Sequence, residues 1–356
     1  MKRLPGSNSP RILLIRFSSL GDVVLASALI RALRQTFPDA EIDFVVRRKY
    51  AELVRHNPRL NTVFEYDART GFSGLKMLKA KLRGREYGVV LDLQKNFRSV
   101  FLRTGLRSRS KILKVKKNQF LRFLLVKFKW NLYRRFYARP LSVAQKYLNA
   151  AEPLLGRCDA PETEIFLPPA ILNEEKERWN RLREQNFAVV MAPGARHFTK
   201  RWPADYYVRL IRRIYENSGG KTVLVGGKDE ASLAREICAG LPAGSCLNLC
   251  GELSVLQTAA LISLAPFFIS NDSGLMHVAA AFGKPQIAIF GSTTRELGFF
   301  PQNPRAVVME NNALACRPCS HIGRAACPKG HFKCMREITP EMVYREYISL
   351  MNPAHF

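Results

Sequence analysis

Short apolar runs alternate with longer amphipathic stretches along the chain, and this alternation predicts a parallel α/β fold. The first run, RILLIRF at Arg11–Phe17, predicts a buried strand. Apolar residues at helical spacing then extend from Val23 to Phe37, and Pro38 ends the helix. Further strands are predicted at Glu41–Val46, Val63–Tyr66 and Tyr87–Leu93.

The same alternation begins again in the second half of the chain. It predicts strands at Phe187–Met191, Lys221–Val225, Leu247–Cys250, Phe267–Ser270 and Gln286–Phe290. It predicts helices at Ala204–Tyr215, Glu230–Cys238, Ser254–Leu264 and Gly274–Phe282. Two Rossmann-like halves in tandem are the simplest architecture for this pattern. Proline and acidic residues at 161–169 suit a linker, so we expect domains at 1–165 and 166–338. A C-terminal helix within 339–356 is expected to pack back on the first domain.

The length and the charge of the chain limit the functions that it can have. A chain of 356 residues and 40.4 kDa exceeds the size of a usual single core, so two domains are expected. The net charge of +27 is far more than solubility needs and predicts a polyanionic partner. Nucleic acid, phospholipid headgroups and phosphorylated saccharides all fit that description.

Much of the excess charge lies in a basic aromatic segment, residues 98–139, where Lys and Arg alternate with Phe, Leu, Trp and Tyr. No acidic residue lies between Asp92 and Glu152. One interpretation is a solvated helix with its apolar side on the core. The other, which we favour, is an interfacial segment that contacts an anionic membrane leaflet.

No apolar run is long enough to cross a bilayer, and Arg16 interrupts the N-terminal apolar stretch before it could form a signal peptide core. We therefore expect a cytoplasmic protein whose eight cysteines are reduced thiols or metal ligands. One group of cysteines, with His321 and His331 among them, is a candidate structural zinc site: Cys316, Cys319, Cys327 and Cys334. The alternative is a set of structural thiols.

The turn Ser18–Asp22 follows the first predicted strand, where open α/β sheets bind their ligands. Asp22, at an ordinary pKa of about 3.9, is ionised at neutral pH and could accept a proton from an attacking hydroxyl. The competing interpretation is a carboxylate that stabilises a helix N-terminus.

The turn NDSG, at 271–274, has the same position in the second half, and His277 follows one helical turn later. Backbone N–H groups at such a helix start bind phosphate oxygens, whereas Asp272 suits sugar hydroxyls. A sugar nucleotide combines both chemistries. A simple helix cap with a core histidine is the alternative.

A third loop, PGARHFTKRWP at 193–203, presents Arg196, His197, Lys200 and Arg201, which could neutralise a departing diphosphate or be a solvated basic loop. Gly226 and Gly227 form a fourth strand-end loop that could hold a ribose or base. The sequence has no GxGxxG fingerprint and no Asp-x-Asp pair for a metal ion. Charge stabilisation would therefore depend on lysine, arginine and helix N-termini.

These loops, in this order, resemble glycosyltransferase family 9, the family of ADP-heptose:lipopolysaccharide heptosyltransferases. The likeness covers nearly the whole chain and is carried by three segments: RFSSLGDVVLASALIRALRQTFPDAEIDFV, APGARHFTKRWP and ISNDSGLMHVAAAFGKPQIAIFGST. The resemblance implies a GT-B fold, an α/β architecture of two Rossmann-like domains that face across a central cleft. It also implies metal-independent transfer with inversion, with no cofactor required for catalysis.

The resemblance further implies roles for individual residues. Asp22 matches the proposed general base, in an N-terminal acceptor-binding domain. The predicted donor-binding set of the C-terminal domain is Lys200, Arg196, Asp272, Ser273, Gly274, His277, Gly226 and Gly227. The predicted diphosphate or acceptor loop comprises Ser18, Ser19 and Gly21. The predicted acceptor residues are Arg47, Asn96 and Arg98.

These inferences predict an enzyme that transfers heptose from ADP-heptose to an anionic lipid-linked saccharide, the inner core of lipopolysaccharide. It would be peripherally associated with the inner membrane and would bind no nucleic acid. A family 9 transferase with another donor or surface-polysaccharide acceptor remains an alternative. A non-enzymatic nucleic-acid-binding protein is supported by charge alone, because no DNA- or RNA-binding motif is visible.

Overall fold

The computed structural model describes residues 10–106 and 110–351 and divides into two compact units. The first unit combines residues up to 117 with 141–166, and the second combines 118–140 with the chain from 167 onward. The second boundary lies within two residues of the predicted one. The excursion at 118–140 was not predicted: it belongs to the second unit, whereas the sequence analysis assigned it to the N-terminal domain.

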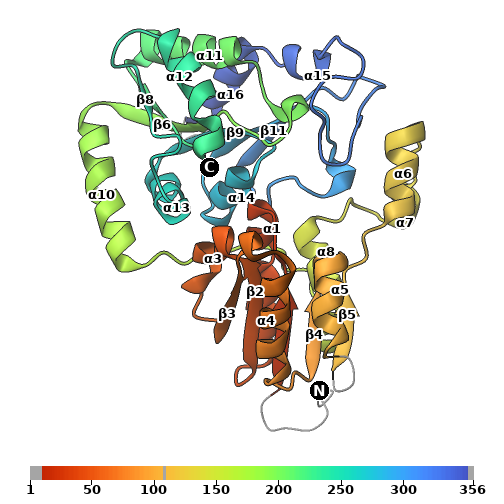
Figure 1. The fold of residues 1–356 in the computed structure, drawn as a ribbon. Helices are drawn as coiled ribbons and strands as arrows, with labels where there is room; N and C mark the ends of the chain where they lie inside the picture. Colours follow the sequence, from red (N-terminus) through yellow and green to blue (C-terminus); the bar gives the residue numbers. More distant parts are fainter. Residues whose placement is uncertain (1–9, 107–109, 352–356) are drawn as a thin grey trace. The chain divides into compact units, whose positions relative to one another are not determined.

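The first unit contains a five-stranded parallel sheet of order β3-β2-β1-β4-β5 (Figure 1). Its strands are β1 (Arg11–Ile15), β2 (Glu41–Arg47), β3 (Thr62–Tyr66), β4 (Val89–Asp92) and β5 (Lys111–Lys114). The first four strands were predicted. They are apolar because both faces of a parallel sheet are covered by helices. Strand β5 was missed, since its four residues KILK are half polar and lie at the sheet edge.

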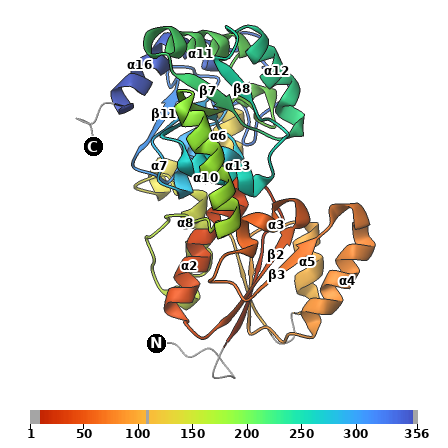
Figure 2. The ribbon, with the colours of Figure 1, turned by 90° about the vertical axis from the view of Figure 1, so that its left-hand side faces the viewer.

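Helices cover both faces of this sheet, as Figure 2 shows, with α2 and α8 on one side and α4 and α5 on the other. The helices of the unit are α1 (Leu20–Leu25), α2 (Ser27–Thr36), α3 (Arg48–Arg55), α4 (Gly71–Arg83), α5 (Phe97–Thr104), α8 (Val143–Ala150) and α9 (Glu152–Leu155). The single helix predicted at 23–37 is therefore two consecutive helices that begin three residues earlier.

The second unit contains a six-stranded parallel sheet of order β11-β10-β9-β6-β7-β8. Its strands are β6 (Phe187–Ala192), β7 (Lys221–Leu224), β8 (Cys246–Asn248), β9 (Phe267–Asn271), β10 (Gln286–Phe290) and β11 (Ala306–Glu310). Strands β9 and β10 are buried along their whole length. Strand β11 was not predicted.

Helices α10, α13 and α14 pack together in this unit, and α11 packs with α12 and α16. The helices of the unit are α6 (Gln119–Phe128), α7 (Tyr133–Phe136), α10 (Pro169–Glu184), α11 (Ala204–Ser218), α12 (Ala231–Ala239), α13 (Val255–Leu264), α14 (Gly274–Ala281), α15 (Lys333–Arg336) and α16 (Pro340–Met351). Helix α16 joins the core of the second unit through Val343 and Tyr347. Packing of this helix on the first domain was predicted and stays a prediction.

Within the described residues, no helix is both long enough and apolar enough to cross a membrane.

The topology places the ligand-binding edge of each unit at a defined point. In an open parallel sheet, the crevice forms at the carboxyl ends of the two strands between which the strand order reverses. These strands are β1 and β4 in the first unit, and β6 and β9 in the second.

Candidate functional site

Asp22 lies at the reversal point of the first unit, in the first turn of α1. Its carboxylate is buried and contacts three side chains. Arg16 Nη2 lies 2.6 Å from Oδ1, and the Tyr147 hydroxyl donates to the same oxygen at 3.2 Å. The backbone N–H and the hydroxyl of Ser19 both donate to Oδ2, at 3.0 and 2.8 Å.

This environment sets the charge of Asp22. Burial opposes ionisation, but the nearby Arg16 guanidinium and the two Ser19 hydrogen bonds outweigh it and hold the pKa of Asp22 below its usual value. The ordinary pKa assumed from the sequence is therefore wrong, although the conclusion that Asp22 is ionised at neutral pH stands. Burial raises the pKa of Tyr147, so its hydroxyl keeps its proton and acts as a donor.

The loop around Asp22 is fixed to the loop that follows β4. Gln94 Oε1 accepts hydrogen bonds from the backbone N–H groups of Phe17 and Ser18, and Arg16 Nη1 donates to the carbonyl of Leu93 at 2.7 Å. Ser19 and Asp22 also form a capping box at the start of α1. Asp22 therefore does cap the start of α1. The same carboxylate also lies at the point of the sheet where the topology predicts a ligand.

Within the described residues, no hydrogen bond joins the predicted acceptor residues Arg47, Asn96 and Arg98 to one another. Arg47 ends β2 and precedes α3, and Arg98 is exposed on α5. Asn96 caps α5, because its side chain accepts from Ser99 N and the Ser99 hydroxyl accepts from Asn96 N. Ser18 and Gly21 lie in the turn that contains Asp22, and their role as a diphosphate or acceptor loop stays a prediction.

In the second unit, the loop after β6 and the turn after β9 meet through an ion pair. Lys200 Nζ lies 2.7 Å from Asp272 Oδ2, and both side chains are largely buried. The Thr293 hydroxyl, from the loop after β10, donates to the same oxygen at 2.6 Å. No further contact to Oδ1 is found among the described residues, so that oxygen is available to a ligand hydroxyl.

Asn271, at the end of β9, fixes these loops to one another. Its side-chain oxygen accepts from Trp202 N at 3.1 Å, and its amide donates to the carbonyl of Pro193 at 2.7 Å. It is fully buried. The two ends of the 193–203 loop are therefore attached to β9, directly before Asp272.

The other predicted donor-binding residues lie around this ion pair. Ser273 and Gly274 begin α14, and the Ser273 hydroxyl makes no hydrogen bond with any described residue. His277 is buried one turn later, and its ring centroid lies 6.5 Å from that of Phe299. Lys200 Nζ lies 6.0 Å from the centroid of the same Phe299 ring. The Ser273 hydroxyl and the backbone N–H groups at the start of α14 can therefore donate hydrogen bonds to a ligand.

The loops after β6 and β7 also approach each other closely. A Cβ atom at Gly194 would lie 2.0 Å from Cγ of Glu230, so any larger residue here would force the Glu230 side chain to move. Glu230 in turn accepts a hydrogen bond from Gly227 N. The loop that contains Gly226 and Gly227 thus lies beside the β6 loop. Arg196 projects from the β6 loop into solvent.

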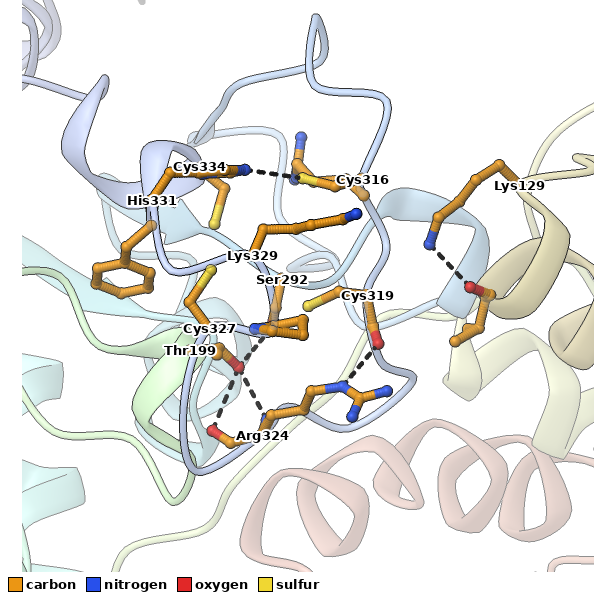
Figure 3. Close-up of a pocket in the computed structure, with 14 residues that line it drawn as sticks. Lys129, Thr199, Ser292, Cys316, Cys319, Arg324, Cys327, Lys329, His331 and Cys334 are labelled. Atoms are coloured by element: carbon orange, nitrogen blue, oxygen red, sulfur yellow. Dashed lines mark hydrogen bonds between the residues drawn. The ribbon is translucent and has the colours of Figure 1, made fainter.

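The four C-terminal cysteines, Cys316, Cys319, Cys327 and Cys334, line a cavity of about 190 Å³ (Figure 3). However, no group of three His, Cys, Asp or Glu side chains within the described residues could hold a metal ion. Lys129, Lys329 and Arg324 line the same cavity and would repel a cation. The predicted structural zinc is therefore not supported, and the four cysteines are free thiols.

The sequence analysis missed three residues that hold the two carboxylates: Arg16, Tyr147 and Thr293. Arg16 was considered only as the end of an apolar run. Tyr147 comes from a helix 125 residues after Asp22. Thr293 lies within the quoted C-terminal segment, directly after a buried strand, and this position was the one available signal.

Comparisons with known proteins agree with this architecture. The sequence profile of glycosyltransferase family 9 (heptosyltransferase) matches residues 75–329. The chain is 26% identical to lipopolysaccharide heptosyltransferase 2 of Salmonella typhimurium, over 96% of this chain and 99% of the relative. It is also 26% identical to lipopolysaccharide heptosyltransferase 1 of Pseudomonas aeruginosa, over 87% of this chain and 86% of the relative.

Among solved structures, the chain is similar to the E. coli ADP-heptose lps heptosyltransferase II. The TM-score is 0.73 at 23% identity, and the match covers 96% of this chain and 98% of the other. This likeness confirms the predicted GT-B class of α/β fold. With the family profile matched over most of its length, the chain belongs to glycosyltransferase family 9 and is a glycosyltransferase.

Proposed function

We propose that this enzyme transfers heptose from ADP-heptose to the inner core of lipopolysaccharide, in the Kdo and heptose region, with inversion at the anomeric carbon. The observation that carries the proposal is the buried Lys200–Asp272 pair at the strand reversal of the second unit. It combines a cation for a diphosphate with a carboxylate for sugar hydroxyls. The relatives named above act on lipopolysaccharide and, in one solved case, on ADP-heptose.

Donor binding is assigned to the second unit. Asp272 Oδ1 accepts a hydroxyl of the sugar, while Thr293 and Lys200 hold Oδ2. Lys200 and the exposed Arg196 neutralise the diphosphate. The Ser273 hydroxyl and the N–H groups at the start of α14 donate to phosphate oxygens. The Gly226–Gly227 loop contacts the nucleoside.

The chemical step is a single displacement. An acceptor hydroxyl oxygen attacks the anomeric carbon and forms the new glycosidic bond, while the bond from that carbon to the diphosphate oxygen breaks and ADP leaves. Asp22 accepts the hydroxyl proton as general base. The negative charge that develops on ADP is met by Lys200, Arg196 and the helix start, so we propose that transfer requires no metal ion.

We also propose that the enzyme works in the cytoplasm and is peripherally bound to the inner membrane. The net charge of +27 supports an anionic, lipid-linked acceptor. The type 1 and type 2 relatives are equally identical to this chain, so the acceptors to be tested include those with and without a first heptose.

The test is a transfer assay with the purified protein. ADP-heptose is incubated with defined Kdo-lipid A acceptors, with and without a first heptose, and both ADP release and product mass are measured. We expect acceptor-dependent ADP release and a product heavier by one heptose. Transfer from ADP-glucose in place of ADP-heptose would support the alternative of a family 9 enzyme with another donor. Absence of product with every donor and acceptor would overturn the proposal.

A further inference from the structure

Five large aromatic side chains are exposed within a short stretch of the second unit. Phe120 is 69% exposed, Trp130 60% and Phe136 62%, and Phe123 and Phe128 are also exposed. Three of the rings touch in a chain: Phe123 contacts Phe128 with ring centroids 5.8 Å apart, and Phe128 contacts Trp130 at 5.3 Å. We call these five residues the aromatic surface.

The aromatic surface is not the side by which this stretch packs on its unit. Leu125 and Tyr133 are buried against Leu297, and Lys129 Nζ donates to the carbonyl of Pro318 at 2.6 Å. Asn131 adds a hydrogen bond to Glu296 Oε1 at 2.7 Å. The ordinary explanation, an amphipathic helix with one side on the core, therefore accounts for the inner side only.

Helical spacing separates the two sides. Leu121, Leu124 and Leu125 form the inner stripe of α6, while Phe120, Phe123 and Lys127 lie at i, i+3 and i+7 on the other side. A helix that is apolar on two sides needs two apolar environments. Only one of them is supplied by the described chain.

The charge around the aromatic surface has one sign. Lys127, Arg135 and Arg139 are exposed, and no salt bridge to them is found in the part of the chain that the structure describes. No acidic residue lies between Asp92 and Glu152 in the sequence. Any partner must therefore supply negative charge together with an apolar phase.

We propose that the aromatic surface inserts into an anionic phospholipid bilayer and that the flanking Lys and Arg side chains bind the lipid phosphates. Aromatic rings concentrate at membrane interfaces, and basic residues near an anionic leaflet strengthen binding. This inference deepens the proposed function, because it names the surface and the unit through which the enzyme meets a lipid-linked acceptor. It concerns the second unit, whereas the sequence pattern assigned this segment to the first domain.

The ring geometry favours a bilayer over single-stranded nucleic acid. Bases stack on the open faces of separate aromatic rings. Here the Phe123 and Phe128 planes meet at 82°, and Phe128 also lies against Trp130, so the rings form one continuous apolar patch. A patch of this kind can contact lipid hydrocarbon, because hydrocarbon chains pack against apolar rings in any orientation.

Trp130 provides an intrinsic probe. The chain has three tryptophans, and the other two, Trp179 and Trp202, are buried. The full-length protein is mixed with vesicles of phosphatidylglycerol and phosphatidylethanolamine, or of phosphatidylcholine alone, without donor or acceptor. We expect binding by sedimentation and a blue shift of tryptophan fluorescence with the anionic vesicles only. The variant Trp130→Phe should still sediment but lose the shift.

Two triple variants separate the contributions of the aromatic rings and of the basic side chains to vesicle binding. Phe120→Ser/Trp130→Ser/Phe136→Ser should weaken vesicle binding at least about tenfold. Lys127→Gln/Arg135→Gln/Arg139→Gln should weaken it by about fivefold for each charge and reduce its salt dependence. The matched control replaces three exposed apolar residues elsewhere with serine and should bind as the wild type does: Met77, Met342 and Ile348. Unchanged thermal unfolding confirms that each variant is folded.

Wild-type protein that ignores anionic vesicles at low salt would overturn the proposal, and so would an aromatic variant that binds them normally. If the aromatic variant instead converts a concentration-dependent dimer into a monomer, the surface joins two copies of the chain and the proposal is also wrong. Preferential binding of a single-stranded oligonucleotide, lost in the same variant, would overturn it in favour of nucleic acid. Because these readouts need no turnover, they are independent of the transfer assay.

Discussion

Replacement of Asp22 by Asn should sharply lower turnover and destabilise the first unit, and the two effects can be measured separately. The substitution keeps the shape of the side chain but removes the charge that pairs with Arg16 at 2.6 Å. Both side chains are about nine-tenths buried, so the ion pair is poorly screened by solvent. Removal of one partner of a buried pair typically costs 3–5 kcal/mol.

The structure puts the cost at the lower end of that range, about 3 kcal/mol. Arg16 keeps its hydrogen bond to the Leu93 carbonyl, and the new amide oxygen can still accept from Ser19 N. A loss of that size corresponds to a fall of about 10 °C in the melting temperature of a unit of this size. Turnover should fall by about 10²–10⁴, the usual contribution of a general base. Donor affinity should stay unchanged.

Asp43→Asn is the matched control. Asp43 is a fully buried carboxylate on β2 of the same sheet; it accepts from the Tyr87 hydroxyl at 2.7 Å and lies 3.3 Å from Arg85 Nη1. Its replacement should cost about 2–3 kcal/mol of stability but leave turnover intact. The assays are calorimetric unfolding, donor titration, and transfer at a temperature where both variants are folded. If Asp43→Asn loses as much turnover as Asp22→Asn, destabilisation explains the loss and the base assignment fails.

The pH dependence has a defined sign. The pKa of Asp22 is lower in the folded chain than its usual value, because Arg16 and Ser19 stabilise the ionised form more than burial destabilises it. The stability that this charge contributes is therefore complete above the unfolded pKa of about 3.9 and is lost as the pH falls through the folded pKa. The difference in unfolding free energy between wild type and Asp22→Asn should be constant from pH 7 to 5. A difference that decays across that range would contradict the reasoning.

Three further predictions concern single contacts. Thr293→Val removes a 2.6 Å hydrogen bond to the donor-site carboxylate and should weaken donor binding about tenfold by calorimetric titration, whereas Thr258→Val, buried on α13, should not. Tyr147→Phe keeps the ring but loses one hydrogen bond, so chemical denaturation should show a loss of about 1 kcal/mol; a loss near zero would mean that the bond is not formed. The Cys238 and Cys246 sulfurs lie 2.8 Å apart, and oxidised glutathione should convert both thiols to a disulfide while it is reduced to two thiols. Peptide mapping by mass spectrometry without reductant checks this, and a Cys238–glutathione adduct as the end product would contradict it.

The main features of the fold could be predicted because parallel strands are buried on both faces and therefore appear as continuous apolar runs. The runs at residues 12–15 and 268–271 are of this kind, and both are central strands. The assignment of 118–140 could not be predicted. It depends on the packing of Leu125 and Tyr133 against Leu297, far away along the chain, and local hydrophobicity contains no information about that contact.

The candidate site could be predicted in part, for a similar reason. A carboxylate in the turn that follows a buried strand must lie at the carboxyl edge of the sheet, so the location of Asp22 and Asp272 at that edge could be predicted from position alone. The side chains that contact these two carboxylates come from distant parts of the chain and are brought near only by tertiary packing. Lys200 reaches Asp272 only because β6 and β9 are neighbours, and Tyr147 reaches Asp22 only through the packing of α8. The lowered pKa of Asp22 follows from such contacts and has no signature in the sequence.

The contacts of Asp22 also constrain how it can act as a base. An ionised carboxylate offers about four lone-pair sites, and four donors already occupy them: Arg16, the Tyr147 hydroxyl, and the N–H and hydroxyl of Ser19. An acceptor hydroxyl must therefore displace one donor. Arg16 is held in place because its ion pair with Asp22 is buried. The Ser19 N–H belongs to the backbone and cannot rotate away. The Ser19 hydroxyl belongs to an exposed residue and can rotate towards solvent, so Oδ2 is the oxygen to which the acceptor proton should pass. Ser19→Ala would vacate that site and should preserve turnover, whereas a base that uses Oδ1 requires displacement of Tyr147 and predicts faster turnover in Tyr147→Phe.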